Sequence, residues 1–121
     1  MIPRSLSICG LTYRVVFVTP GKGPPGWTKG QEGECNCDRG IIYLAARLRS
    51  NPTRLRDAFV HEVCHAISEG TGLRRWLKKL VPARARRAKA SSDALYELEE
   101  DVVRIVTPAL CAALESAGLI K

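Results

Sequence analysis

The stretch Phe59-Val60-His61-Glu62-Val63-Cys64-His65-Ala66 places an HExxH pattern inside a run of helix-forming residues. Residues four apart lie on the same face of a helix, so His61 and His65 can offer two imidazole nitrogens to one metal ion. Glu62 lies beside them, where a carboxylate can act as a general base. These are the only two histidines of the chain. The pattern therefore predicts a zinc site with Glu62 as the catalytic base.

The residues around this motif predict where its helix begins and ends. Asn51 is a favourable N-cap, Pro52 suits the first helical position, and Gly70 is expected to end the helix. Between them the helix is apolar on most sides, which predicts that it is buried. Two histidines and a glutamate in a buried helix need partners or a metal ion to offset the cost of their burial.

The motif still needs a third ligand, because a catalytic zinc usually has three from the protein. The chain has no third histidine, so we expect a carboxylate. A long last helix, capped by Ser91 or Ser92, is predicted to run towards Ala117, with a stop at Gly118 and a kink at Pro108. This helix carries four acidic residues: Glu97, Glu99, Glu100 and Asp101.

The phase of the last helix favours Glu99 among these four. At about 100° per residue, Glu99 lies near the centre of the apolar face and Glu100 on its flank. A carboxylate in a buried stripe is costly unless it is paired or coordinated. We therefore expect Glu99 to be the third ligand and keep Glu100 in reserve, since a phase error of one residue exchanges them. Pairing of Glu99 with an arginine is the alternative.

A further acidic residue, Glu69, lies one turn beyond His65 and is a candidate to orient an imidazole by accepting its N–H. An exposed position at the end of the helix is an equally good interpretation.

The N-terminal part predicts a short sheet. Residues 5–9 and 12–19 have the composition of two strands separated by a turn at Gly10, and Gly40 to Leu44 predicts a third after a polar turn at Glu34 to Arg39. This third strand is expected either at an edge, where it could pair with a substrate, or in the core. Pro20 to Trp27 must be a loop. The prediction is one α+β domain over residues 1–121, with about three strands packed on the motif helix and the last helix.

The size and composition of the chain limit the classes of protein to which it can belong. The 121 residues suit one domain, and no apolar run reaches the ~20 residues of a membrane span. The N-terminus lacks the features of a secretion signal, so a cytoplasmic location is expected. Five cysteines, an odd number, indicate reduced thiols; Cys35 and Cys37 are too close for a zinc knuckle and are expected to be loop thiols.

The net charge of +7 is concentrated in a basic amphipathic segment, residues 73–90. Its apolar positions recur at helical spacing as far as Pro82 and are expected to join the core. Its cations are Arg74, Arg75, Lys78, Lys79, Arg84, Arg86, Arg87 and Lys89. Such a segment can bind nucleic acid, an acidic partner or an anionic membrane surface, or it can be a solvated face.

The order of a hairpin, a further strand and the run Leu55 to Ala66 resembles the minimal zincin metallopeptidases. Small phage and prophage proteins of this kind look similar, as do, more distantly, the SprT-like and ImmA/IrrE-like families. Leu98 to Val103 resembles the glutamate-bearing helix of the gluzincin type. The similarity covers roughly residues 8–110 in the order of elements, and only the HExxH is a specific match.

The resemblance implies a small zincin-like fold and hydrolysis of a protein or peptide substrate at one Zn²⁺ held by two histidines and a glutamate. The candidates to stabilise the oxyanion are Tyr96, Tyr43, Tyr13 or an arginine. The alternative function is a basic, nucleic-acid-associated protein whose zinc site is structural or vestigial, and the two functions can be combined.

Overall fold

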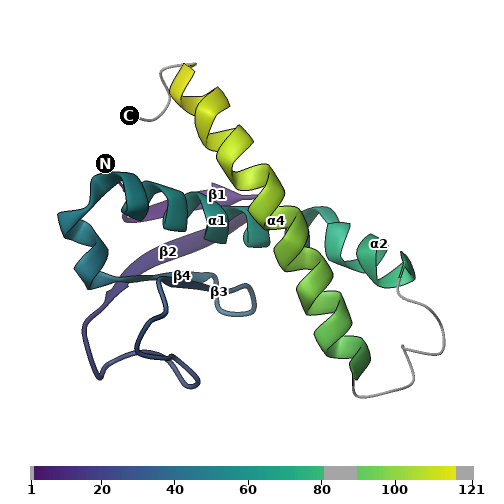
Figure 1. Ribbon diagram of the computed structural model, residues 1–121, viewed down its shortest axis with the longest axis horizontal. Helices are drawn as coiled ribbons and strands as arrows, with labels where there is room; N and C mark the ends of the chain where they lie inside the picture. The colour runs from purple at the N-terminus through teal and green to yellow at the C-terminus, as the bar shows by residue number, and fades with distance from the viewer. Residues whose placement is uncertain (1, 81–89, 117–121) are drawn as a thin grey trace.

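The computed structural model of the chain describes residues 2–80 and 90–116 and is an α+β domain (Figure 1). Its strands are β1 (Ser5–Ile8), β2 (Leu11–Val18), β3 (Gly33–Asn36) and β4 (Ile41–Ala45). A short 3₁₀ helix, η1 (Ala46–Ser50), leads into the helices α1 (Pro52–Thr71), α2 (Leu73–Leu80) and α4 (Ala90–Ser116).

The four strands form one mixed sheet in the order β1-β2-β4-β3. β1 and β2 make an antiparallel hairpin, whose turn at Cys9 and Gly10 has positive φ angles of 50° and 81°, as a two-residue type I′ turn requires. β2 runs parallel to β4, and β3 pairs antiparallel with the other side of β4. Because β2 and β3 pair with its two sides, β4 lies inside the sheet, and its residues are mostly buried.

The sequence predicted about three strands, whereas the structure has four. The polar turn predicted from Glu34 to Arg39 is wrong for residues 34–36, which belong to a strand. Gly33–Asn36 form the edge strand β3, in which every residue is half-buried. Without alternation between buried and exposed positions, such a strand carries no period-2 signal. Since β4 is internal, the edge position considered for the segment from Gly40 to Leu44 belongs to β3 instead.

Helix α1 begins as predicted and ends later than predicted. The Asn51 side chain accepts a hydrogen bond from the Arg54 amide at 3.2 Å, and Pro52 is the first helical residue. The helix continues through Gly70 to Thr71 and ends at Gly72, whose φ of 78° is the left-handed C-cap conformation. Gly70 has a different role, because a Cβ there would lie 2.6 Å from Cys9 Cβ. The absence of a side chain at Gly70 lets α1 approach the β1–β2 turn.

Helix α1 forms the middle of the domain. One face packs on the sheet around the buried residues Ile42 and Leu44 of β4 and Ala58 and Ala66 of α1. The long helix α4 crosses α1 diagonally (Figure 1), and a second cluster, made by Val60, Cys64, Val103 and Cys111, joins these two helices. The residues of the HExxH motif therefore lie on a helix that is covered by the sheet and by α4.

The basic segment is described only in part. The amphipathic helix predicted from Leu73 is present as α2 (Leu73–Leu80), but Trp76 is 56 % exposed, so its expected place in the core is wrong. Arg75 and Lys79 are exposed on the same helix. Residues 81–89, which include Arg84, Arg86, Arg87 and Lys89, lie outside the described residues. Among the helices described, none has both the length and the hydropathy to cross a bilayer.

Candidate metal centre

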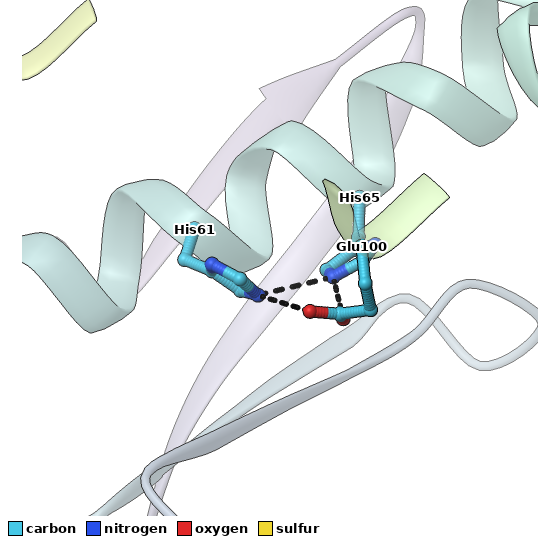
Figure 2. A group of neighbouring side chains, drawn as sticks. All are labelled: His61, His65 and Glu100. Carbon is cyan, nitrogen blue, oxygen red and sulfur yellow. Dashed lines mark hydrogen bonds and ion pairs between the residues drawn. The ribbon is translucent and has the colours of Figure 1, made fainter. Parts of the chain in front are cut away.

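Helix α1 directs the two histidine side chains towards each other. His61 Nε2 and His65 Nε2 lie 3.2 Å apart, one helical turn from each other, with their rings at 69° (Figure 2). His65 is 8 % exposed, while the His61 side chain is 25 % exposed. The predicted pairing of the two imidazoles on one face of α1 is thus present.

Glu100 of α4 completes the group. Its Oε1 lies 2.7 Å from His65 Nε2, and its Oε2 lies 3.4 Å from His61 Nε2. The potential ligand atoms of His61, His65 and Glu100 all lie within 4.8 Å of one another, and Figure 2 shows the carboxylate facing both rings. Two imidazole nitrogens and one carboxylate oxygen therefore converge on one point.

This donor set fits a divalent metal ion. Two imidazoles and a carboxylate are a ligand combination used by catalytic zinc sites. Two nitrogens bound to one tetrahedral zinc at ~2.0–2.1 Å are about 3.3 Å apart, and the two Nε2 atoms here are 3.2 Å apart. The histidines are thus already spaced for a shared ion.

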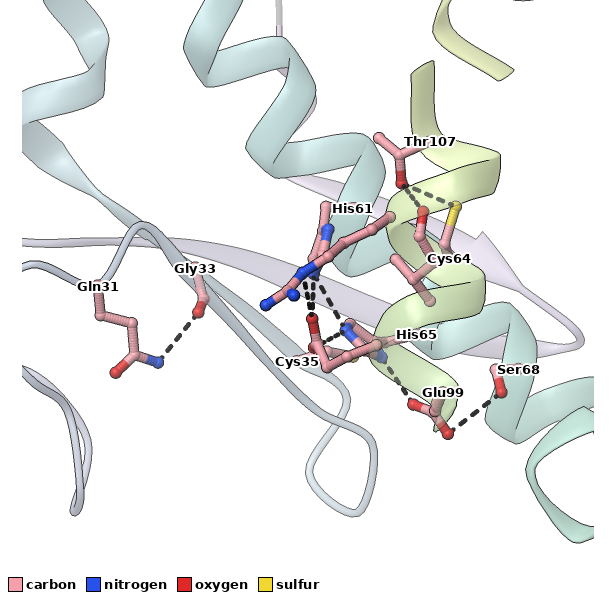
Figure 3. Close-up of polar contacts among 12 residues, drawn as sticks. Gln31, Gly33, Cys35, His61, Cys64, His65, Ser68, Glu99 and Thr107 are labelled. Atoms are coloured by element: carbon pink, nitrogen blue, oxygen red, sulfur yellow. Dashed lines mark hydrogen bonds and ion pairs between the residues drawn. The ribbon is translucent and has the colours of Figure 1, made fainter. Parts of the chain in front are cut away.

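The prediction that Glu99 is the third ligand requires correction. Glu99 is buried, at 4 % exposure, as the helix phase indicated. However, its Oε1 lies 2.6 Å from His65 Nδ1, on the opposite side of the ring from Nε2, and its Oε2 accepts a hydrogen bond from Ser68 Oγ at 3.4 Å (Figure 3). The histidine and the serine offset the burial of this carboxylate. Glu100, the reserve candidate, lies where the third ligand is needed.

Glu99 instead orients His65. A histidine that binds a metal through one ring nitrogen commonly donates the other N–H to a carboxylate, which fixes the tautomer and the direction of the ring. Of the two interpretations left open for Glu69, the structure supports the exposed position near the end of α1. The buried Glu99 is the residue in contact with His65 Nδ1.

Glu62 lies between the histidines and the edge strand. It is 7 % exposed, and a Cβ at Gly33 of β3 would lie 2.9 Å from both its Cγ and its Oε1. Burial, reinforced by the negative charges of Glu100 and Glu34 and opposed by His65, raises the pKa of Glu62 to about 7. The Glu62 side chain therefore occupies the space that a side chain at residue 33 would fill.

The two histidines have opposite electrostatic surroundings. Burial lowers the pKa of His61, against the partial opposition of the Glu100 carboxylate. Burial also disfavours the charged form of His65, but the hydrogen bond to Glu99 and the neighbouring carboxylates outweigh it, so the pKa of His65 is raised. A neutral His61 has a lone pair available for a metal ion.

These groups line an open cleft of about 910 Å³ between the loop that precedes β3, helix α1 and helix α4. The loop wall is held by Arg47, whose guanidinium donates to the carbonyls of Gly30 and Gln31 at 2.9 and 3.1 Å. The Gln31 side chain in turn donates to the Gly33 carbonyl at 3.0 Å (Figure 3). The cleft is therefore built from segments distant in sequence and pinned by side chain–backbone hydrogen bonds.

Of the candidates to stabilise an oxyanion, the arginine option is the one found in the cleft. Arg104 lines it, one turn after Glu100, with its Nε 3.7 Å from Glu100 Oε2 and its side chain 71 % exposed. Tyr13 is buried in the core and Tyr43 lies on β4 away from the cleft lining. The side chain of Tyr96 lies outside the described residues.

Sequence reasoning missed Gly33 and did not single out Arg104. The signal for Arg104 was its spacing of four from Glu100, which puts both on one face of α4. Gly33 gave no signal, because its importance depends on β3 lying against α1. No protein-family model, curated protein or solved structure matches this chain. The interpretation of the site therefore depends on its geometry.

Proposed function

We propose that this protein is a zinc-dependent metallopeptidase of the zincin type, which hydrolyses peptide bonds. The observation that supports this most strongly is the convergence of His61, His65 and Glu100 beside Glu62 in an open cleft. A buried carboxylate next to a three-donor group is what general-base hydrolysis requires.

In this proposal His61, His65 and Glu100 hold the ion, and Glu99 fixes the ring of His65. Zinc supplies Lewis acidity, which polarises a carbonyl group and acidifies water. Glu62 accepts the proton of the attacking water and delivers it to the leaving amine. Arg104 can donate a hydrogen bond to the carbonyl oxygen as negative charge develops on it.

The shape of the cleft suits an extended peptide. β3 is an edge strand, and its residues Gly33, Glu34 and Cys35 line the cleft directly beside Glu62. An extended chain can pair with the backbone of an edge strand, which aligns a peptide bond without regard to side-chain identity. The substrate class we propose is therefore a protein segment in an extended conformation.

A second candidate function, binding of a nucleic acid or an acidic partner, is supported by α2, where Arg75 and Lys79 are exposed beside the exposed Trp76. It is compatible with a peptidase that is recruited to such a partner. Salt-sensitive DNA binding that is lost when Arg84, Arg86 and Arg87 are neutralised would support it. The absence of DNA binding at low salt would remove it.

The test of the peptidase proposal is Glu62→Gln, compared with Glu69→Gln as a matched control on the exposed surface of the same helix. Glu62→Gln should keep about one equivalent of bound zinc by elemental analysis. Cleavage of a denatured protein substrate should fall by about 10²–10⁴-fold, the usual contribution of a general base. Glu69→Gln should behave as wild type. Undiminished cleavage by Glu62→Gln, or a wild type that binds no metal, would reject the proposal.

A further inference from the structure

Two thiols meet at the end of the strand that forms the cleft wall. Cys35 belongs to β3 and Cys37 follows directly after it, and their Sγ atoms lie 3.6 Å apart. Both residues are half-buried, and Cys35 lines the cleft. A disulfide has an S–S distance of about 2.05 Å, so a shift of roughly 1.5 Å would bring the sulfurs into bonding distance.

The other three thiols have different surroundings. Cys64 and Cys111 are buried between α1 and α4, and burial raises the pKa of both. The Cys64 sulfur also accepts a hydrogen bond from Thr107 at 3.9 Å (Figure 3). Cys9 is exposed, in the β1–β2 turn. Only the thiolate form reacts rapidly, so the buried pair is protected. Cys35 and Cys37 combine access from the cleft with a thiol neighbour.

The surroundings of Cys37 hold its side chain in place. The hydroxyl of Tyr13, a residue that is 1 % exposed, forms a hydrogen bond with the Cys37 thiol. The next turn is closed by Asn36, whose Oδ1 accepts a hydrogen bond from the Arg39 amide at 3.0 Å. Hydrogen bonds at residues 36 and 37 thus accompany the 3.6 Å approach of the two sulfurs.

We propose that Cys35 and Cys37 form a reversible dithiol–disulfide site that a peroxide oxidises. One thiolate attacks the peroxide oxygen and becomes a sulfenic acid, which releases the first water. The second thiol attacks that sulfur, the S–S bond forms, and the sulfenic oxygen leaves as the second water. The two sulfurs lose two electrons and hydrogen peroxide gains them. A dithiol reverses the step by thiol–disulfide exchange.

Closing this bond must change the cleft. Bond formation shortens the Sγ–Sγ distance from 3.6 Å to about 2.05 Å. The disulfide therefore draws Cys37, in the turn that follows β3, towards Cys35 and shifts the end of this strand. Gly33, two residues before Cys35, lies against Glu62, which occupies the space that a Cβ at residue 33 would fill. The shift thus reaches the wall beside the base, and an effect on catalysis rests on the proposed function.

The experiment treats the full-length protein with limiting hydrogen peroxide, then counts thiols after denaturation and maps disulfides by peptide mass. Wild type and the control Cys9→Ser should each lose two thiols. The peptide that contains residues 35 and 37 should lose two hydrogen atoms, and dithiothreitol should restore both thiols. Cys35→Ser should form no intramolecular disulfide. If Cys64 and Cys111 react before this pair, or if the loss is irreversible, the proposal is overturned.

Peptide cleavage is measured on the same samples. Oxidised wild type should cleave severalfold more slowly than reduced wild type, while Cys35→Ser should not respond to peroxide. Equal rates for the oxidised and reduced wild type would overturn the coupling to the cleft. If the disulfide forms and no sample cleaves any substrate, the thiol site stands and the peptidase proposal fails, so the two failures are distinguishable.

Discussion

The two sides of the His65 imidazole lie in opposite surroundings. On the Nδ1 side are Glu99 and Ser68, both buried, at 4 % and 1 % exposure. On the Nε2 side are His61 and Glu100, which are partly exposed and face the cleft. One nitrogen of the ring therefore makes a buried polar contact, and the other faces the open cleft.

Because of this difference, contacts on the Nδ1 side position the ring, while the Nε2 side is available for the proposed metal ion. The closed side holds the ring rigidly, because its donors and acceptors are paired away from water and moving them would leave buried groups without partners. The open side presents the other nitrogen at a distance suited to a shared ion. Glu99 and Glu100 are neighbours in sequence, yet they act on opposite edges of one side chain.

The strongest test of this comparison is removal of the open-side carboxylate. Glu100→Ala should reduce zinc affinity by more than the about 100-fold that loss of a supporting contact can cost, because it removes a proposed direct ligand. Competition with a fluorescent zinc chelator measures the affinity, and Asp101→Asn, on the exposed side of α4, is the control. If Glu99→Ala weakens zinc binding more than Glu100→Ala does, the assignment of the two glutamates is reversed.

Removal of the closed-side carboxylate should have a smaller effect on the metal and a clear effect on stability. Glu99→Ala should weaken zinc binding by about 10–100-fold, since His65 loses the partner that fixes its ring. The free energy of unfolding should fall by about 1–3 kcal/mol, since buried groups of His65 and Ser68 lose their acceptor. Urea denaturation of the metal-free protein gives the second value. An unchanged unfolding midpoint would show that Glu99 is not the buried support described here.

The wall of the open side can be tested at Gly33. In Gly33→Ala the new Cβ would clash with Glu62, which must then move while the histidines stay in place. Zinc binding should be retained and kcat should fall by up to about 100-fold, as expected for a misplaced catalytic group. Gly30→Ala is the matched control, because it lines the same cleft and a Cβ there meets no atom within 4 Å. Equal kcat values for both variants would remove Gly33 as a positioning residue.

The smallest effect is expected at Ser68. Its hydroxyl donates to Glu99 over 3.4 Å, a long hydrogen bond. Ser68→Ala should therefore cost no more than about 0.5–1.5 kcal/mol of unfolding free energy and leave zinc affinity within a few-fold of wild type. Thr71→Ala, which removes an exposed hydrogen bond on the same helix, is the control. A large loss of zinc affinity in Ser68→Ala would mean that the serine, more than the carboxylate, positions the ring.

The parts of the molecule governed by local rules were predictable from the sequence. Asn51 and Pro52 begin α1 because a cap and a fixed φ act within one turn, and the spacing of His61 and His65 defines a face of any helix. The hairpin of β1 and β2 follows from its composition and from the glycine in its turn. The helix phase also gave the burial of Glu99 correctly.

The remainder depended on contacts between distant segments. The burial of Glu99 predicted metal coordination, but His65 and Ser68 satisfy the carboxylate, and that contact exists only once α4 crosses α1. β3 is a strand because β4 offers it a free edge, which its own four residues do not reveal. Gly70 resembled a helix stop, whereas close contact with Cys9 excludes a side chain at that position.

The crossing of α1 and α4 has a further consequence for how the protein unfolds. α4 is attached to the domain chiefly through α1 and α2, while the sheet packs on the far side of α1. An ion held by His61, His65 and Glu100 would be a cross-link between α1 and α4. At a free concentration of 100 times its dissociation constant it stabilises the joined state by about 2.7 kcal/mol. Amide hydrogen exchange in α4 would then report metal binding: opening of this helix alone would be about 100-fold rarer, while the hairpin at the other end of the domain would exchange at its former rate.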